Sequence, residues 1–412
     1  MECYLVGGAV RDQLLGLQVV ERDWVVVGAT PEDLIALGYR QVGRDFPVFL
    51  HPQTQEEYAL ARTERKTQAG YRGFSVHASP DVTLTQDLMR RDLTINAIAE
   101  DPSGQLIDPY GGLADLEARK LRHVSPAFVE DPVRILRVAR FAARFHGLGF
   151  RIDASTLALM IQMVEANEVD ALTPERVFQE LQRVLNGPDP AVFFDTLRQC
   201  GALKRIFPEL DALFGVPQDP QHHPEGDTGV HSLLALTEAT KLSPDPAIRF
   251  AALVHDLGKA LTPSDSWPSH PEHEALGLEA LDQMALRLKI PTHYKELAGK
   301  VMRYHGAVHR IAAFQPPELL HLIEGLDGIR RPENLEPVAI ACEADSRGRW
   351  GFEHQPYPQR PLLLAAGEIV KRVPTDVLKS QGYKGAAFGD ALRTLRIDAL
   401  RTFCKERGSL NG

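Results

Sequence analysis

The sequence predicts an α+β chain, in which a mixed α/β head is followed by segments that are helical throughout. Over residues 1–110, short runs rich in strand-forming residues alternate with glycine turns and a few helical patterns. From about residue 115 onward the apolar residues recur at helical spacing, interrupted by clusters of Pro and Gly. At 412 residues the chain exceeds what one hydrophobic core normally serves, so we expect several domains.

Four short apolar runs are the predicted strands of the head, at residues 4–6, 24–27, 48–51 and 58–61. The helical part is divided by Pro and Gly clusters, of which the one at 222–226 indicates a domain boundary. We therefore divide the chain into a head (1–125), a helical neck and body (126–226), a further helical domain (228–329) and a helical tail (330–412).

Composition excludes several classes of protein. No apolar stretch approaches the roughly 18 residues of a spanning helix, and the start Met-Glu-Cys-Tyr lacks the basic flank of a signal peptide, so we expect a cytoplasmic protein without a membrane partner. The four cysteines fall in no metal-binding spacing. A net charge of −9 argues against indiscriminate nucleic-acid binding, although local clusters of basic residues can override the total.

A glycine turn follows the first predicted strand, in Leu5-Val6-Gly7-Gly8-Ala9-Val10-Arg11-Asp12. Glycines let backbone amides approach a triphosphate, and Arg11 can add a forked cation. Glu21 and Asp23 lie two residues apart at the edge of the next strand, so alternation predicts that both carboxylates share one face, where they can hold Mg²⁺. Each feature alone is commonly a turn or a solvated strand end. Their order and closeness indicate a site that transfers phosphate groups on metal ions.

A basic stripe marks the predicted neck helix. Its arginines are Arg134, Arg137, Arg140 and Arg144, at spacings of three, three and four, which places them along one side of the helix. Asp131 is the predicted N-cap, with Pro132 at the first helical position. Two interpretations are open, because the stripe is either a binding surface or a solvated basic face.

With Arg90-Arg91-Asp92-Leu93-Thr94-Ile95-Asn96-Ala97, these segments resemble, in sequence and order, the head and neck of class II nucleotidyltransferases, which include bacterial CCA-adding enzymes and poly(A) polymerases. The resemblance covers at least the first 150 residues. It implies that Arg91, Arg137 and Arg140 contact the nucleotide. It also implies that Glu130, Asp131 and Arg134 read the base edge, where carboxylates accept from an exocyclic amino group and arginine donates to ring nitrogen or carbonyl.

The implied chemistry is two-metal nucleotidyl transfer, with Gly8 and Arg11 on the triphosphate and Glu21 and Asp23 on two Mg²⁺ ions. The family pattern has aspartate where this chain has Glu21, so we expect metal binding with altered geometry. Glu57, on a neighbouring predicted strand, is either a third carboxylate or base, or a surface charge. The segments 63–66 and 71–73 form either a mobile loop near this site or an ordinary surface loop.

A second series of residues, rich in His and Asp, runs through His231, His255-Asp256-Leu257-Gly258-Lys259, His270, His273, His305 and Asp345. This series resembles the HD phosphohydrolase domain. The run 250–254 predicts a buried helix that Gly258 ends, and a His-Asp pair inside such a helix is costly unless it binds something. Imidazole with carboxylate suits Ni²⁺, Mn²⁺, Co²⁺ or Zn²⁺ rather than Ca²⁺, and such a metal activates water for phosphate-ester hydrolysis.

The ligands of this second site can be ranked. We place His255 and Asp256 first, followed by His231, His305, His273 and Asp345, with His270 as a spare. The alternative is that these histidines cap helices and pair with carboxylates, because structural ion-pair networks produce similar clusters.

The order of head, neck, body and HD domain resembles bacterial multifunctional CCA-adding enzymes across nearly the whole chain. The resemblance implies addition and repair of the 3′-terminal CCA of tRNA from CTP and ATP without a nucleic-acid template. It further implies phosphatase, 2′-nucleotidase and 2′,3′-cyclic phosphodiesterase activity in the HD domain. The expected partners are the 3′ end and acceptor arm of tRNA, recognised mainly by shape and phosphates, and the expected state is a monomer or homodimer.

Three alternatives remain open at this point. The first is a poly(A) polymerase, or an enzyme that adds only A or only CC, which would share the head. The second is an HD nucleotide phosphohydrolase with a regulatory head. The third is an RNA-binding module with inactive sites.

Overall fold

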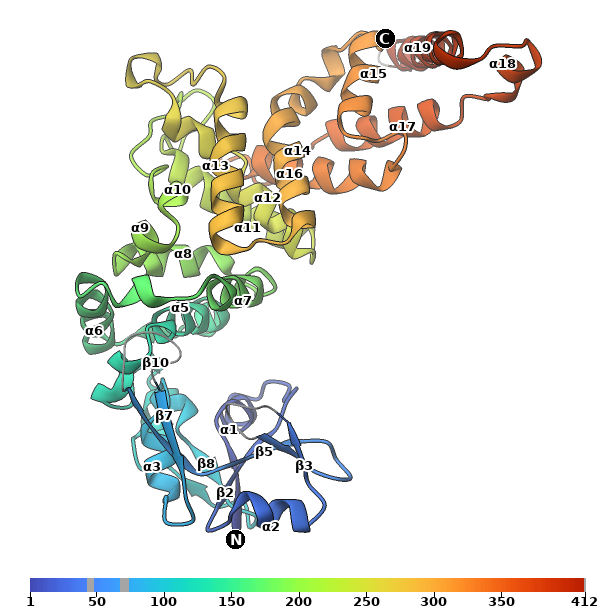
Figure 1. Cartoon of the computed structure of the whole chain (residues 1–412). Helices are drawn as coiled ribbons and strands as arrows, with labels where there is room; N and C mark the ends of the chain where they lie inside the picture. Colours follow the sequence, from blue (N-terminus) through green and yellow to red (C-terminus); the bar gives the residue numbers. More distant parts are fainter. Residues whose placement is uncertain (43–47, 67–73, 411–412) are drawn as a thin grey trace. The chain divides into compact units, whose positions relative to one another are not determined.

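The computed structural model of the chain describes residues 1–42, 48–66 and 74–410, which form two compact units, Met1–Ile206 and Phe207–Gly412 (Figure 1). The first unit holds a mixed sheet followed by helices, and the second is helical. This confirms the predicted α+β class. The units divide before the cluster at 222–226, so residues 207–226 belong to the second unit, and the four-domain division stays a prediction.

The head is built on a seven-stranded sheet of order β3-β4-β5-β2-β1-β8-β9. Strand β2 pairs in parallel with β5 and antiparallel with β1. The four predicted strands are all present, each within two residues of its predicted bounds. The strands of the sheet are β1 (Glu2–Val6), β2 (Asp23–Val27), β3 (Arg40–Val42), β4 (Val48–Leu50), β5 (Glu57–Leu60), β8 (Ala99–Glu100) and β9 (Leu106–Ile107).

Both faces of this sheet are covered, because alternate residues of β2 enter different cores. Val25 packs with Leu84 and Leu88, whereas Val26 packs with Leu34 and Phe49. The helices involved are short and begin with capping boxes, in which a threonine and the third helical residue satisfy each other's backbone N–H. The head helices are α1 (Gly8–Leu14), α2 (Pro31–Ala36), α3 (Leu84–Met89) and α4 (Gly112–Glu117).

Residues 63–66, predicted as part of a loop, lie in strand β6 (Arg62–Lys66), which pairs with β7 (Phe74–Ala78). Antiparallel pairing with β7 holds residues 63–66 in a strand, so the prediction of a loop is wrong for this segment. The segment 71–73 lies outside the described residues.

The neck and body follow as helices that complete the first unit. Strand β10 (Lys120–Leu121), at the end of the head, pairs in parallel with β11 (Arg151–Ile152), which follows the first helix of the neck. The helices are α5 (Val133–Phe145), α6 (Ala154–Glu165), α7 (Pro174–Leu185), α8 (Pro190–Gln199) and α9 (Ala202–Ile206).

The second unit packs α11, α12, α14 and α16 around a buried core. Aspartates cap two of these helices, since Asp227 accepts from the Val230 N–H and Asp245 from the Ala247 N–H. Its helices are α10 (Pro208–Asp211), α11 (Thr228–Leu242), α12 (Pro246–Val254), α13 (His273–Leu288), α14 (Thr292–His309), α15 (Pro316–Gly325), α16 (Leu335–Arg347), α17 (Gln359–Lys371), α18 (Asp376–Ser380) and α19 (Gly385–Leu410).

The end of α12 differs from the prediction. The helix stops at Val254, so His255 and Asp256 follow it instead of lying inside it, and a short 3₁₀ turn, η6 (Leu257–Leu261), comes next. Gly258 therefore has another purpose. A Cβ atom there would lie 1.8 Å from the His273 carbonyl oxygen, so only glycine lets η6 approach the start of α13.

No helix among the described residues is long and apolar enough to cross a membrane.

Candidate active sites

The first unit contains a pocket of about 460 Å³ that the head and the neck helices line together. Nine arginines and three aspartates contribute to its walls, an excess of positive charge that suits an anionic ligand. Its lining includes Gly7, Gly8, Arg11, Asp23, Arg62, Arg90, Arg91, Asp92, Asn96, Asp131, Arg134, Arg137, Arg140, Phe141, Arg144 and Arg176. The structure thus brings together Gly8, Arg11, Arg91, Asp131, Arg134, Arg137 and Arg140. Glu130, which was also predicted to read the base edge, instead lines a different pocket.

The glycine turn lies at the wall of this pocket. Gly7 has φ +70°, which favours glycine, and a Cβ atom there would lie 2.6 Å from the Arg91 guanidinium. Arg11 is 2% exposed, donates to Asp12 and Asn96, and stacks 5.1 Å from the Phe141 ring. Arg11 therefore joins the head to α5, in addition to lining the pocket.

The head carboxylates meet at the start of two parallel strands. Asp23 is the first residue of β2 and lies beside Glu57 of β5 in register. Glu21 precedes the strand, so strand alternation does not set its side, contrary to the prediction. It nevertheless acts on Asp23, because partial desolvation and the Glu21 charge together raise the pKa of Asp23 against the opposing effect of Arg91.

These carboxylates line a second, acidic pocket of about 400 Å³ together with Glu56. Of the four, only Asp23 also lines the arginine-rich pocket. Among the described residues of this unit, no three His, Cys, Asp or Glu donors lie within 4.8 Å of one another. Mg²⁺ commonly takes one or two carboxylates and completes its shell with phosphate and water, so the residues present fit that ion.

The arginine stripe of α5 faces the pocket rather than forming a solvated surface. Each member is bonded to another part of this unit. Arg137 Nε donates to Asp92 at 2.6 Å, Arg140 Nε to Glu180 at 2.6 Å, and Arg144 to Asp12 at 2.8 Å. Arg134 donates to two backbone carbonyls, those of Ala127 and Arg90.

Arg176 was not identified from the sequence. It lies in the first turn of α7, and its two terminal nitrogens donate to the two oxygens of Asp131 at 3.0 and 2.7 Å, a bidentate pair. The prediction of Asp131 as the N-cap of α5 is wrong by one residue, because the helix begins at Val133 with Pro132 at the N-cap position, although Asp131 accepts from the Val133 N–H at 3.1 Å. No motif in the sequence distinguishes Arg176, because its partner is 45 residues away.

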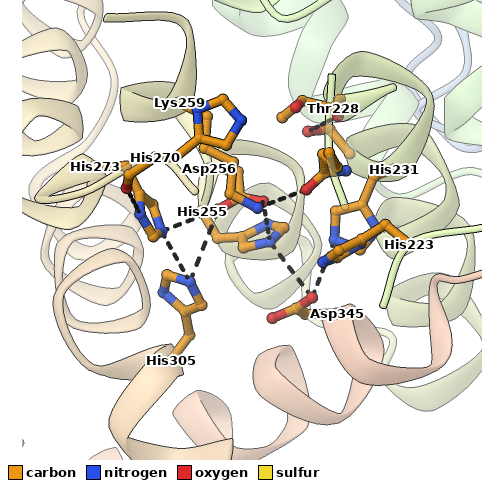
Figure 2. A network of polar contacts seen from close by, with 12 residues as sticks. His223, Thr228, His231, His255, Asp256, Lys259, His270, His273, His305 and Asp345 are labelled. Atoms are coloured by element: carbon orange, nitrogen blue, oxygen red, sulfur yellow. Dashed lines mark hydrogen bonds and ion pairs between the residues drawn. The ribbon is translucent and has the colours of Figure 1, made fainter. Parts of the chain in front are cut away.

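The second unit gathers the six ranked HD ligands around one buried centre (Figure 2). They come from α11, the end of α12, the start of α13, α14 and α16. His231 Nε2 lies 3.0 Å from Asp345 Oδ1, His255 Nε2 3.2 Å from Asp256 Oδ2, and His273 Nε2 3.5 Å from His305 Nε2. His270, the spare, instead bonds Thr262 and the Pro217 carbonyl and lies outside these groups.

The histidines of this centre are held in the tautomer that a metal ligand needs. The Nδ1–H groups of His255, His273 and His305 each donate to a backbone carbonyl, which leaves Nε2 facing the centre. His255 Nε2 and Asp256 Oδ1 are buried without a hydrogen-bond partner. Such groups are costly to bury, so the residues present fit a divalent transition metal.

The pKa values of two of these histidines are shifted in opposite directions. Burial lowers the pKa of His255, but the carboxylates of Asp256 and Asp345 outweigh it and raise that pKa to about 10. Burial lowers the pKa of His305 to about 3, and the charges of His255 and His309 add to this effect while Asp256 and Asp345 oppose it.

Further residues support the ligands. Glu225 Oε1 lies 2.9 Å from His231 Nδ1 and 3.0 Å from His223 Nδ1. His309 Nε2 donates to Asp345 Oδ2 at 2.7 Å and accepts at Nδ1 from the Tyr357 hydroxyl. His309 was detectable in the sequence, since it lies four residues after His305 on one helix. His223 and Glu225 were not, because their cluster reads as a domain boundary.

Three segments of the chain match known protein families. Residues 3–122 match the poly A polymerase head domain, residues 149–214 the probable RNA and SrmB-binding site of polymerase A, and residues 228–349 the HD domain.

Relatives and solved structures agree with these matches. The multifunctional CCA protein of Methylococcus capsulatus is 62% identical over 402 residues, 97% of this chain and 95% of that protein. That of Thioalkalivibrio sulfidiphilus is 60% identical, over 99% of this chain and 100% of that protein. The fold resembles that of the Bacillus stearothermophilus CCA-adding enzyme in complex with CTP, with a TM-score of 0.64 at 22% identity over 99% of this chain and 94% of that one. The fold also resembles that of the Thermotoga maritima CCA-adding enzyme complexed with tRNA, with a TM-score of 0.63 at 22% identity over 96% of this chain and 86% of that one.

The resemblance inferred from the motifs is therefore confirmed, and both sites lie in the segments that these families cover. The chain belongs to the family of multifunctional CCA proteins, as a CCA-adding nucleotidyltransferase that also carries an HD domain.

Proposed function

We propose that the first unit adds and repairs the 3′-terminal CCA of tRNA, taking CTP and ATP in turn without a nucleic-acid template. The observation that carries this is the single pocket in which phosphate-binding arginines, Asp23 and the Asp131–Arg176 pair come together. Proteins of known structure with this fold hold CTP, ATP or tRNA. A base-reading element made of protein side chains removes the need for a template strand.

The residues divide the task among them. The backbone amides at Gly7 and Gly8 and the arginines of α5 bind the triphosphate, and Asp131 with Arg176 and Arg134 faces the base. Mg²⁺ held by Glu21 and Asp23 would lower the pKa of the incoming 3′-hydroxyl and neutralise the leaving pyrophosphate. The nucleophile belongs to the tRNA, so no protein serine or cysteine is required.

The test uses tRNA lacking CCA with labelled CTP and ATP, separately and together. The wild-type chain should add three nucleotides in order, and Asp23→Asn should lose at least about 100-fold in rate, since it removes a metal ligand. Asp256→Asn, in the other unit, is the matched control and should add CCA normally. A long tail from ATP alone would identify a poly(A) polymerase instead, and undiminished turnover of Asp23→Asn would refute the assignment of the head.

We further propose that the HD domain removes phosphate from RNA ends and nucleotides, as a phosphatase, 2′-nucleotidase and 2′,3′-cyclic phosphodiesterase that depends on a transition metal such as Ni²⁺, Mn²⁺ or Co²⁺. The buried unpartnered donors of His255 and Asp256 support a bound metal, which would supply an activated water. Lys259 Nζ, 2.7 Å from Asp256 Oδ2, adds a positive charge where a phosphate would enter.

The two activities fit one role, because a tRNA end that carries a phosphate cannot act as a nucleophile until that phosphate is removed. Hydrolysis of 2′,3′-cyclic AMP with added Ni²⁺ should disappear in Asp256→Asn and persist in Asp23→Asn. The control is His321→Ala, which removes the imidazole of an exposed histidine on α15 and should leave hydrolysis unchanged. If Asp256→Asn hydrolysed at the normal rate, this function would be wrong.

A further inference from the structure

Asp87 is a buried carboxylate of the head that lies outside both candidate sites. It is 0% exposed and is not among the described residues that line the arginine-rich pocket. Its partners Arg62, Arg90 and Arg91 do line that pocket. Its helix, α3, is fixed in the core of the head by two buried leucines. Asp87 therefore does not reach a ligand in the pocket but contacts three residues that can.

The two oxygens of Asp87 serve different partners. Oδ1 accepts from Arg90 Nε at 3.0 Å, from Arg90 Nη2 at 2.7 Å and from the Arg62 backbone N–H at 3.3 Å. Oδ2 accepts from Arg91 Nη2 at 3.2 Å. The spacings of three and four residues bring both guanidinium groups back to Asp87. One carboxylate thus joins two arginines of the pocket to the first residue of β6.

The position of Arg91 depends on this contact. In the described part of the chain, the one ion pair of Arg91 is with Asp87, and Arg91 Nε is buried without a hydrogen-bond partner. Arg91 Nη1 lies against the glycine turn, since a Cβ atom on Gly7 would be 2.6 Å from it. The guanidinium is therefore held between Asp87 and the turn. An arginine that is ordered in advance loses less freedom when a ligand binds.

The charge of Asp87 is retained in spite of its burial. Burial acts against ionisation, but Arg90 and Arg91 outweigh it and hold the pKa of Asp87 below its usual range. The carboxylate is thus ionised at neutral pH. A negative charge behind the pocket also lets guanidinium groups of like charge lie close together at its wall.

We propose that Asp87 is a positioning residue of the nucleotide pocket, which holds the Arg91 guanidinium against the glycine turn so that it meets the incoming nucleotide. The inference rests on the proposed function of the first unit, because it takes CTP and ATP as the ligands. Asp87 gives no atom to the nucleotide, so its effect passes through Arg91.

Asp87→Asn tests this with little change of shape. The amide oxygen should replace Oδ1, which has three donors, so the amide nitrogen faces Arg91 Nη2 and repels it. We expect the KM values for CTP and ATP and the dissociation constant for CTP with Mg²⁺ each to rise about 10-fold, with kcat within about 3-fold of wild type. Glu117→Gln, which removes an exposed carboxylate of α4, is the matched control and should keep the wild-type values.

A double-mutant cycle shows whether Asp87 acts through Arg91. Arg91→Ala alone should weaken CTP binding, and adding Asp87→Asn should change it by less than about 2-fold more, because the group that Asp87 holds is gone. A role in packing alone would lower the active fraction and the melting temperature but leave the KM values unchanged. Unchanged affinity for CTP in Asp87→Asn, or an equal loss with and without Arg91, would overturn the inference.

If Asp87→Asn does not fold, nuclear magnetic resonance of the arginine-labelled wild-type chain gives a second reading. The guanidinium signals of Arg91, identified by their loss in Arg91→Lys, should show slow rotation in the absence of nucleotide. Fast rotation would contradict the proposal. Binding of CTP that depends on Asp87, in a chain that adds no CCA to tRNA, would refute the proposed function and leave this inference intact.

Discussion

Asp92 is a buried carboxylate that ties the head to the neck helix. One oxygen accepts from Arg137, and the other accepts from the Leu93 N–H and the Asn96 amide. Burial opposes the charge, but Arg137 and these hydrogen bonds outweigh it and hold the pKa of Asp92 well below its usual range. Because the folded-state pKa is depressed, this stabilisation is complete above the unfolded pKa of about 3.9 and is lost as the pH falls through the folded value.

Asp92→Asn should lower the free energy of unfolding of the first unit by about 2 kcal/mol at pH 7. This is below the 3–5 kcal/mol of a fully buried pair, because 35% of the Arg137 side chain is exposed. Urea unfolding at pH 7, 5 and 3.5 should show the difference from wild type shrinking below about pH 4. The control Asp195→Asn, at an exposed position of α8, should match wild type throughout. A difference that is constant with pH would show that the charge of Asp92 is not the cause.

Arg176→Ala should weaken binding of the incoming base under the proposed function, because Asp131 loses its bidentate partner. We expect the kcat/KM values for CTP and ATP each to fall by at least about 10-fold, or about 1.4 kcal/mol. Arg176→Lys should recover only part of this, since lysine keeps the charge without the fork. Unchanged incorporation with both nucleotides would exclude Arg176 from the site.

At the scale of elements, the strands of the head could be predicted because each is a short apolar run between turn residues, a pattern that is local in the sequence. Asp23 and the His255-Asp256 pair were predicted for the same reason, since each lies in a compact motif, whereas His231, His305 and Asp345 are far apart in sequence and were predicted from the resemblance to the HD domain. Arg176 could not be found, because its role depends on a pairing between two helices far apart in sequence. The end of α12 was placed wrongly because Gly258 was interpreted as a helix stop, whereas its small size serves a contact with α13 that only the fold reveals.

Gly258→Ala should destabilise the second unit by at least about 2 kcal/mol, because the new methyl group meets backbone atoms of His273 and Gly277 that cannot move cheaply. Gly299→Ala, in the interior of α14, is the matched control. Its Cβ would meet nothing closer than 3.6 Å, so it should be neutral or stabilise by up to about 1 kcal/mol. Thermal unfolding measures both, and CCA addition should persist in each.

At the scale of the whole molecule, the chain consists of two compact units, each with its own candidate site, the arginine-rich pocket in the first and the buried cluster of His and Asp in the second. The units divide at Phe207, before the Pro- and Gly-rich cluster at 222–226 that indicated a domain boundary, because such clusters mark turns but do not show whether the flanking helices share a core. Such clusters are local, whereas a unit is defined by contacts between distant segments.

Calorimetry should therefore show two transitions that respond to different ligands. Ni²⁺ at about 100 times its dissociation constant should stabilise the second unit by about 2.7 kcal/mol and leave the first transition in place. Asp256→Asn should abolish this shift. CTP with Mg²⁺ should instead raise the other transition, and a common shift of both by either ligand would show that the units unfold together.

The arginines of α5 carry one more consequence. Asp92, Glu180 and Asp12 each accept from one nitrogen of Arg137, Arg140 and Arg144, and a guanidinium carries five N–H donors, so each arginine can keep its carboxylate while it donates to an entering anion. The carboxylates thus hold the three guanidinium groups in place before a ligand arrives. A triphosphate that spans several of them therefore loses less freedom on binding than one that has to order each arginine itself.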